Sequence, residues 1–244
     1  MDDIFAAIRR DTTKFNLGDE ETWRELFEPF IPDPPTDSVT LLSNERYGPA
    51  ERNQLDVYVP VSKQPNKPVL LFLHGGGFFS GDKAWSKKYW GNIGYFFAQH
   101  GIVTVVATHR MVPHVQYPGG AEDVQLMREW IYKNIASERY GLGSVDKVIL
   151  FGHSSGGAHI AMNLYAAGVF VSVAVGDSSR PLKNTVVPPV AGIMYFSVPF
   201  WYDRTRPIRA KILRNYYGSD AEDAWKASNH PSLFFCSPDA LATG

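Results

Sequence analysis

The chain has 244 residues, of which 44% are hydrophobic, and this length and composition suit one domain with a sizeable buried core. Lys and Arg number 24 against 25 Asp and Glu, so the net charge of -1 argues against a nucleic acid or an anionic membrane as the main partner. The single cysteine excludes an internal disulfide framework, and no Cys/His cluster has the spacing of zinc ligands. No apolar signal core and no membrane-spanning run of roughly 20 residues are found, which predicts a soluble, cytoplasmic protein without a metal.

The N-terminal region is expected to be helical. Apolar residues recur among charged ones from residue 2 to 30, which predicts two short amphipathic helices broken near 16–18. The proline-rich stretch 29–35 ends this helical region. Two strands are predicted next, at 38–42 and 55–59, with a polar hairpin connection between them.

A glycine-rich loop follows the third predicted strand, the wholly apolar run 69–73. Residues 74–81 read His-Gly-Gly-Gly-Phe-Phe-Ser-Gly. Three consecutive glycines suit a loop whose backbone N–H groups approach a ligand with no side chain in the way. A flexible turn is the alternative interpretation. The first is favoured because the loops that bind ligands in α/β sheets lie at the ends of strands.

The middle of the chain alternates between helix and strand. A helix is predicted at 89–100 and a fourth buried strand at 102–107. A long helix should then carry one apolar face, because its apolar residues are spaced by three and four: Val124, Met127, Ile131 and Ile135. The glycines at 141 and 143 end this helix.

A serine lies between a strand and a helix at 147–157, where Lys-Val-Ile-Leu-Phe is followed by Gly-His-Ser-Ser-Gly-Gly. This is the G-x-S-x-G pattern, in which a sharp turn exposes the hydroxyl of Ser154 above the sheet. Gly152 and Gly156 would keep strand and helix clear of each other. The N–H of Ser155, at the start of the helix, can face an oxyanion.

Beyond the serine helix the pattern is less regular. The apolar run 169–175 has no firm assignment, 177–184 reads as a polar loop, 191–198 as a strand and 207–218 as a helix. Asp177 is expected to be a loop cap, and Cys236 to pack. The alternation from residue 69 onward predicts a parallel sheet with helices on both faces.

With both motifs in place, the chain resembles the HGGG-bearing esterase branch of the α/β-hydrolases, the hormone-sensitive-lipase-like and kynurenine-formamidase-like group, over about residues 40–235. Residues 74–81 are similar to its oxyanion-hole loop. Residues 109–113, with Pro118 and Asp123, are similar to its Tyr-Arg-Leu-x-Pro…Pro…Asp segment, although His109 replaces the usual tyrosine. The resemblance implies a single α/β-hydrolase domain, with a core at 36–198 and helical cap segments at 1–35 and 199–230.

The resemblance also implies roles for individual residues. Ser154 would be the nucleophile, the amides of Gly76, Gly77 and Ser155 the oxyanion donors, and Arg110 and Asp123 structural residues. Candidate substrate contacts are Phe78, Trp201 and Tyr202, although core packing explains the last two equally well. The implied activity is hydrolysis of a small carboxylic ester or an aryl formamide through an acyl-serine, without a cofactor.

The sequence shows no clear base for this serine. In this fold the acid and then the histidine follow the serine along the chain, and only His159 and His230 do so here. His159 is expected to be a helix-face residue of the serine's own helix. His230 could pair with an acid at 220, 222 or 223, but the segment before these acids reads as a helix and not as the required strand.

Two alignments of the tail are open. Residues 232–236 could be the next strand, with Asp239 as the acid, or 229–234 could match the Ser-Pro-Leu segment that precedes that strand, which we prefer. Neither leaves a histidine after the acid, so the chain resembles a hydrolase cut short, with a truncated tail at 231–244. The strand 191–198 would then form an apolar sheet edge open to self-association. The alternative function is a catalytically impaired or non-catalytic fold that binds ligands or partners.

Overall fold

The computed structural model describes residues 2–11, 20–86, 88–165, 188–200 and 205–219. At the N-terminus, α1 (Asp2–Asp11), α2 (Glu20–Phe27) and the short 3-10 helix η1 (Glu28–Phe30) precede the sheet. Strands β1 (Val39–Arg46) and β2 (Gln54–Pro60) then form an antiparallel pair. The two predicted helices and the hairpin are therefore confirmed.

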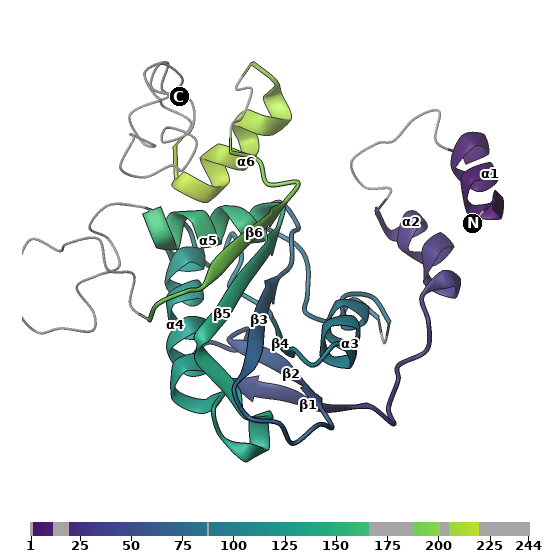
Figure 1. The fold of residues 1–244 in the computed structure, drawn as a ribbon. Helices are drawn as coiled ribbons and strands as arrows, with labels where there is room; N and C mark the ends of the chain where they lie inside the picture. The colour runs from purple at the N-terminus through teal and green to yellow at the C-terminus, as the bar shows by residue number, and fades with distance from the viewer. Residues whose placement is uncertain (1, 12–19, 87, 166–187, 201–204, 220–244) are drawn as a thin grey trace, which may run out of the picture.

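The centre of the fold is one six-stranded sheet with the order β1-β2-β4-β3-β5-β6 among the described residues (Figure 1). Its other strands are β3 (Lys67–Leu73), β4 (Val103–Ala107), β5 (Gly143–His153) and β6 (Gly192–Phe196). Strand β2 is antiparallel to β1 and β4, whereas β4, β3, β5 and β6 run parallel. The predicted mostly parallel sheet is thus confirmed.

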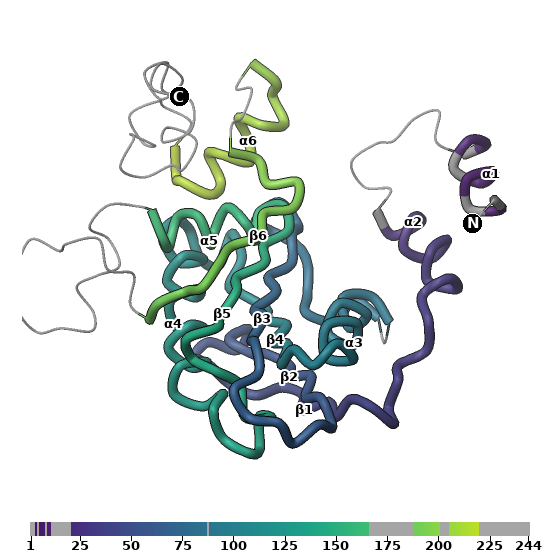
Figure 2. The backbone as a smooth tube through the Cα atoms, viewed as in Figure 1, coloured from purple at the N-terminus to yellow at the C-terminus, as the bar shows by residue number. Residues whose placement is uncertain are grey.

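Helices cover both faces of this sheet. Helix α3 (Gly91–Gln99) lies on one face, and α4 (Gly119–Asn134) and α5 (Ser155–Tyr165) lie on the other, as the backbone tube also shows (Figure 2). Alternate side chains of β3 lie on opposite faces of the sheet. Leu71 belongs to the hydrophobic cluster that contains Met127 of α4, and Phe72 belongs to the hydrophobic cluster that contains Ala98 of α3. This explains why the parallel strands are apolar without alternation. The remaining elements are the 3-10 helix η2 (Glu138–Tyr140) and α6 (Pro207–Tyr217).

The register of the parallel strands brings three sequence motifs to one edge. Leu73 of β3 pairs with Ala107 of β4 and with Gly152 of β5. The segments that follow these residues therefore leave the sheet side by side at its carboxyl edge. These segments carry the glycine loop, His109 and Ser154.

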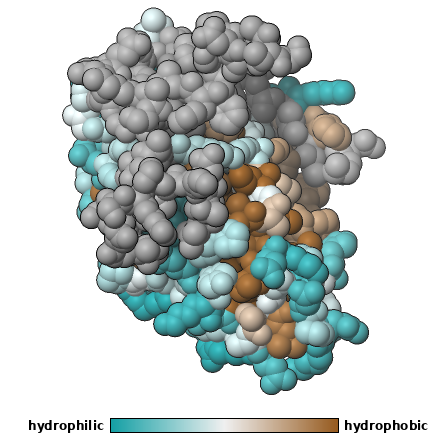
Figure 3. Space-filling model, turned by 60° about the vertical axis from the view of Figure 1, so that its left-hand side comes forward, coloured by the Kyte–Doolittle hydropathy of each residue, from teal (hydrophilic) through white to brown (hydrophobic). Residues whose placement is uncertain are grey.

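Strand β6 is the last strand of the described sheet. On it, Met194 is 38% and Phe196 60% exposed, in line with the predicted apolar edge. Figure 3 brings the left-hand side of Figure 1 forward and shows a hydrophobic band with hydrophilic residues around it.

Several predictions fall outside the described residues. They concern the run 169–175, the loop 177–184 and the tail 229–244, with Asp177, His230, Cys236 and Asp239 as the residues named in them. Trp201 and Tyr202 also lie outside. No helix in the described ranges has both the length and the apolar character needed to cross a membrane.

Candidate active site

Ser154 stands alone between the end of β5 and the start of α5. Its φ of 50° lies in the left-handed region, where a residue with a Cβ is strained. Its N–H donates a 2.9 Å hydrogen bond to the carbonyl of Phe196 on β6, and its side chain is half-buried. The predicted sharp turn is confirmed, and β6 holds it from the side.

Close backbone contacts make this turn depend on glycine. A Cβ on Gly75 would lie 2.7 Å from the Cβ of Ser154, and a Cβ on Gly156 would overlap the carbonyl oxygens at the end of β3. Gly152 lies against Gly157, whose importance the sequence reasoning missed. The expected role of Gly156 was therefore wrong in detail: it separates α5 from β3, while Gly157 makes room for Gly152.

The glycine loop is a tight turn built around one carbonyl. Gly76, Gly77 and Phe78 all have positive φ, at 136°, 63° and 75°. The Gly76 carbonyl accepts hydrogen bonds from the N–H of Phe79 (3.2 Å) and from both the N–H (3.0 Å) and the hydroxyl (2.9 Å) of Ser80. Within the described ranges the N–H groups of Gly76 and Gly77 donate no loop or turn backbone hydrogen bond. Neither N–H is thus committed to a backbone acceptor among the described residues.

The third candidate donor comes from the serine helix. Ser155 is the first residue of α5, so its N–H has no acceptor within the helix. The side chain of Ser155 is only 1% exposed, and its hydroxyl has no partner among the described residues. The role of these three amides as an oxyanion hole stays a prediction.

Two phenylalanines of the loop point to different environments. Phe78 is 2% exposed and stacks on Tyr216 of α6 with ring centroids 4.0 Å apart. Phe79, which the sequence reasoning did not single out, is 52% exposed. In the structure the Phe78 ring packs in the core. A substrate contact by this residue stays a prediction.

Three buried histidines cluster beneath the loop: His74, His109 and His159, each at most 1% exposed. The rings of the first two are stacked with centroids 4.7 Å apart, and His159 meets His109 edge-on at 4.7 Å. Burial lowers the pKa of all three imidazoles, and the neighbouring imidazoles lower those of His74 and His159 further. The cluster is therefore neutral at pH 7. No local sequence pattern predicts this cluster, because its members are 35 and 50 residues apart along the chain.

None of these three histidines is bonded to Ser154. The Nδ1 of His74 faces the Gly75 carbonyl at 2.7 Å, and that of His109 faces the Arg110 carbonyl at 2.9 Å. The hydroxyl of Tyr216 lies 3.0 Å from the Nδ1 of His159. His159 is a residue of the buried helix face, which agrees with its predicted non-catalytic position.

His153, next to the serine, lies between two aromatic rings. Its ring centroid is 5.5 Å from that of Trp90 and 5.6 Å from that of Phe196. Burial lowers its pKa as well. Across the described ranges no group of three or more His, Cys, Asp or Glu side chains is arranged to hold a metal ion.

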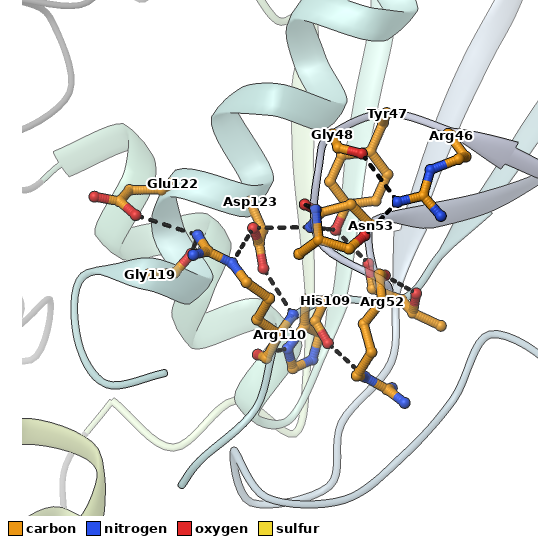
Figure 4. A network of polar contacts seen from close by, with 12 residues as sticks. Arg46, Tyr47, Gly48, Arg52, Asn53, His109, Arg110, Gly119, Glu122 and Asp123 are labelled. Carbon is orange, nitrogen blue, oxygen red and sulfur yellow. Dashed lines mark hydrogen bonds and ion pairs between the residues drawn. The ribbon is translucent and has the colours of Figure 1, made fainter. Parts of the chain in front are cut away.

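A buried carboxylate organises the segment after β4 (Figure 4). Asp123, fully buried on α4, accepts hydrogen bonds from the backbone N–H (2.7 Å) and Nε (2.8 Å) of Arg110 and from the Nδ2 of Asn53 (3.1 Å). The Asn53 amide also donates to the hydroxyl of Tyr47 at 3.0 Å. This geometry agrees with the structural role expected of Arg110 and Asp123.

The N-terminal segment contacts the chain just after the glycine loop. The guanidinium of Arg24 lies 3.1 Å above the ring of Trp85, and the Ser86 hydroxyl donates to Glu28 at 2.5 Å. Lys88 forms a 2.8 Å ion pair with Asp33. A cap role for this segment stays a prediction.

Comparison with solved structures identifies the architecture. Esterase B from Lactobacillus rhamnosis matches with a TM-score of 0.66 at 17% sequence identity, over 95% of this chain and 70% of that chain. The chain has the α/β-hydrolase fold. A second structure, vibralactone cyclase, matches with a TM-score of 0.53 at 20% identity, over 78% of this chain and 51% of that chain.

The sequence relatives of this chain include esterases and a formamidase. The BD-FAE family model matches residues 55–169, which is somewhat less than half of the chain. The "Probable isoprenylcysteine alpha-carbonyl methylesterase ICMEL1" of Oryza sativa subsp. japonica is 35% identical over 115 residues, 47% of this chain and 25% of the relative. The kynurenine formamidase of Danio rerio is 31% identical over 117 residues, 47% of this chain and 35% of the relative. The chain thus spans about a quarter to a third of the length of these relatives. The names of these relatives confirm the resemblance to the esterase branch.

Proposed function

We propose that this α/β-hydrolase chain supplies the nucleophile and the oxyanion hole of a serine hydrolase that cleaves small carboxylic esters or aryl formamides. The observation that carries the proposal is the position of Ser154. Its strained turn follows β5 and the glycine loop follows β3, and because these two strands are adjacent and parallel, both segments leave the sheet at the same edge, which supports a shared site.

In the proposed reaction the Ser154 hydroxyl oxygen attacks the carbonyl carbon of the substrate. The hydroxyl proton passes to a base that lies outside the described residues. The negative charge on the carbonyl oxygen is stabilised by the N–H groups of Gly76, Gly77 and Ser155, and losing one such donor typically costs about 2.7–4 kcal/mol of transition-state stabilisation. The alcohol or amine then leaves with a proton, and water hydrolyses the acyl-serine to release the acid.

The substrate class rests on the relatives. One is named a methylesterase and another a kynurenine formamidase, and both reactions transfer an acyl or formyl group from oxygen or nitrogen to water. A short acyl ester and N-formylkynurenine therefore are the two substrates to compare, by measuring the turnover of each.

The test is covalent labelling of Ser154 with a fluorophosphonate in the full-length protein, with Ser154→Ala as the control. We expect the wild type to gain one phosphonyl adduct at this residue and the variant none. An unlabelled but folded wild type would overturn the proposal and favour a non-catalytic binding fold. Because triad variants of serine hydrolases retain rates about 10³–10⁴ above water, weak turnover alone would not support a full triad.

We also propose that the exposed edge of β6 associates with a second copy of the chain, since Met194 and Phe196 present apolar surface there. Sedimentation of the wild type and a Met194→Lys variant tests this. A concentration-dependent dimer that the substitution weakens is expected, and a monomeric wild type would refute it. A cytoplasmic location stays a prediction from the cysteine content.

A further inference from the structure

Arg52, in the connection between β1 and β2, reaches across to two loops at the carboxyl edge of the sheet. Its Nη2 donates a 2.8 Å hydrogen bond to the carbonyl of Gly81, the last residue of the glycine loop. Its Nε donates a 2.9 Å hydrogen bond to the carbonyl of His109. Its Nη1 lies 3.5 Å from the carboxylate of Asp82. One planar guanidinium thus binds two backbone carbonyls from different segments.

Both of these carbonyls belong to residues that contact His74. A Cβ on Gly81 would overlap the His74 Nδ1 and the Gly75 carbonyl, so the Gly81 backbone lies directly against the start of the glycine loop. On the other side, the His109 ring stacks on that of His74. His74 Nδ1 is also 2.7 Å from the Gly75 carbonyl, so Gly81, His109 and Gly75 all lie against the same ring.

Arg52 is itself held firmly. Its carbonyl accepts a hydrogen bond from the hydroxyl of Thr108, and its neighbour Asn53 donates to the buried Asp123. Figure 4 shows the Arg52 side chain extending from this network toward His109. The guanidinium therefore connects a fixed part of the fold to the glycine loop.

We propose that Arg52 is a positioning residue for the oxyanion-hole loop. It fixes Gly81 and His109 on either side of His74, and in this way it keeps the N–H groups of Gly76 and Gly77 aimed at the reacting oxygen. The catalytic consequence rests on the proposed function, but the effect on the loop does not. Lysine cannot replace this residue fully, because a single ammonium lacks the planar fork that reaches two acceptors at once.

The expected effect is a loosened loop and not an unfolded one. Lys83, just after the loop, forms a buried 2.9 Å ion pair with Asp56 that does not involve Arg52. Loss of an entire oxyanion donor lowers kcat by about 10²–10³. Misalignment of two donors that remain present should cost less than the loss of one, so we expect kcat to fall by roughly 10-fold.

The experiment compares Arg52→Ala and Arg52→Lys with Arg46→Ala in the full-length protein. Arg46 is the matched control, because it lies on the same hairpin and, in the part of the chain that the structure describes, donates to the hairpin carbonyls of Gly48, Pro49 and Ala50. The first readout is amide hydrogen exchange in residues 75–82, measured by mass spectrometry. The second is kcat and KM for a short acyl ester, together with the rate of fluorophosphonate labelling.

For Arg52→Ala we expect faster exchange in 75–82 and a kcat roughly 10-fold lower, with KM changed by less than about 3-fold. Arg52→Lys should fall between this variant and the wild type, and Arg46→Ala should match the wild type in both readouts. Unchanged exchange in 75–82 in a folded Arg52→Ala or Arg52→Lys protein would overturn the inference. If the wild type is not labelled at Ser154, the proposed function fails, while the exchange measurement still decides the role of Arg52.

Discussion

The buried histidine cluster should make the fold sensitive to mild acid. His74, His109 and His159 all have a pKa lowered by burial, so the folded state favours the neutral form of each imidazole. In the unfolded chain the same side chains titrate near pH 6.5. Below that pH the unfolded state binds more protons than the folded state, so stability falls as the pH decreases toward the folded-state pKa values.

The size of this loss follows from the number of histidines. Between pH 7.5 and 5.5, one histidine that stays neutral in the folded state costs about 1.4 kcal/mol of unfolding free energy. Three such residues would cost about 4 kcal/mol, a large part of the 5–15 kcal/mol that stabilises a typical domain. The charge of Asp123 favours protonated His109 and reduces its share, whereas Arg52 opposes protonation of the same ring. The figure of about 4 kcal/mol is therefore an upper value.

The assay is urea unfolding at pH 7.5 and 5.5, followed by tryptophan fluorescence. The variant His109→Asn keeps a side-chain N–H near the Nδ1 position, which can still donate to the Arg110 carbonyl, but it does not titrate. It should lose less than the wild type over this pH range, by at most about 1.4 kcal/mol. His100→Asn is the control, because His100 is exposed, and it should lose as much as the wild type. An equal loss in His109→Asn and the wild type would refute the reasoning.

Three further substitutions test the packing around the serine. Because Ser154 has a positive φ, Ser154→Gly should be about 0.5–1 kcal/mol more stable than Ser154→Ala in thermal unfolding, and an equal or lower stability would contradict the strain. Gly156→Ala should destabilise by about 2–3 kcal/mol or more, since its Cβ overlaps carbonyl oxygens of β3, and a loss below about 1 kcal/mol would show that α5 can shift. Tyr216→Phe should cost about 1–3 kcal/mol because it leaves the Nδ1 of His159 unpaired, whereas Tyr132→Phe, at a 53% exposed position, should cost almost nothing.

The sequence predicted the parts of the fold that leave a local pattern. Apolar runs marked β3, β4 and β5, a period of three and four residues marked α4, and glycine next to serine marked the turn at Ser154. The apolar run at 191–198 likewise marked β6, which is the last strand of the sheet among the described residues. These features depend on neighbouring residues, so one sequence is enough to reveal them.

The contacts that hold the site left no such pattern. Arg52 binds carbonyls 29 and 57 residues away, and Tyr216 reaches His159 across 57 residues. The hydrogen bond from the Ser154 N–H to the Phe196 carbonyl joins two backbone groups, so no side-chain pattern predicts it. Side-chain identity alone did not predict that His109, in place of the usual tyrosine, would stack on His74.

Orientation and activation of the serine are therefore separate tasks in this fold. Orientation rests on described residues: the strained turn, the close glycines and the Phe196 carbonyl hold Ser154 without help from a titratable group. The Nδ1 atoms of the three buried imidazoles face partners other than Ser154, so none of these rings orients the serine hydroxyl through that atom. Activation needs a base that removes the proton of Ser154, and in the described residues no histidine of this cluster is hydrogen-bonded to the serine.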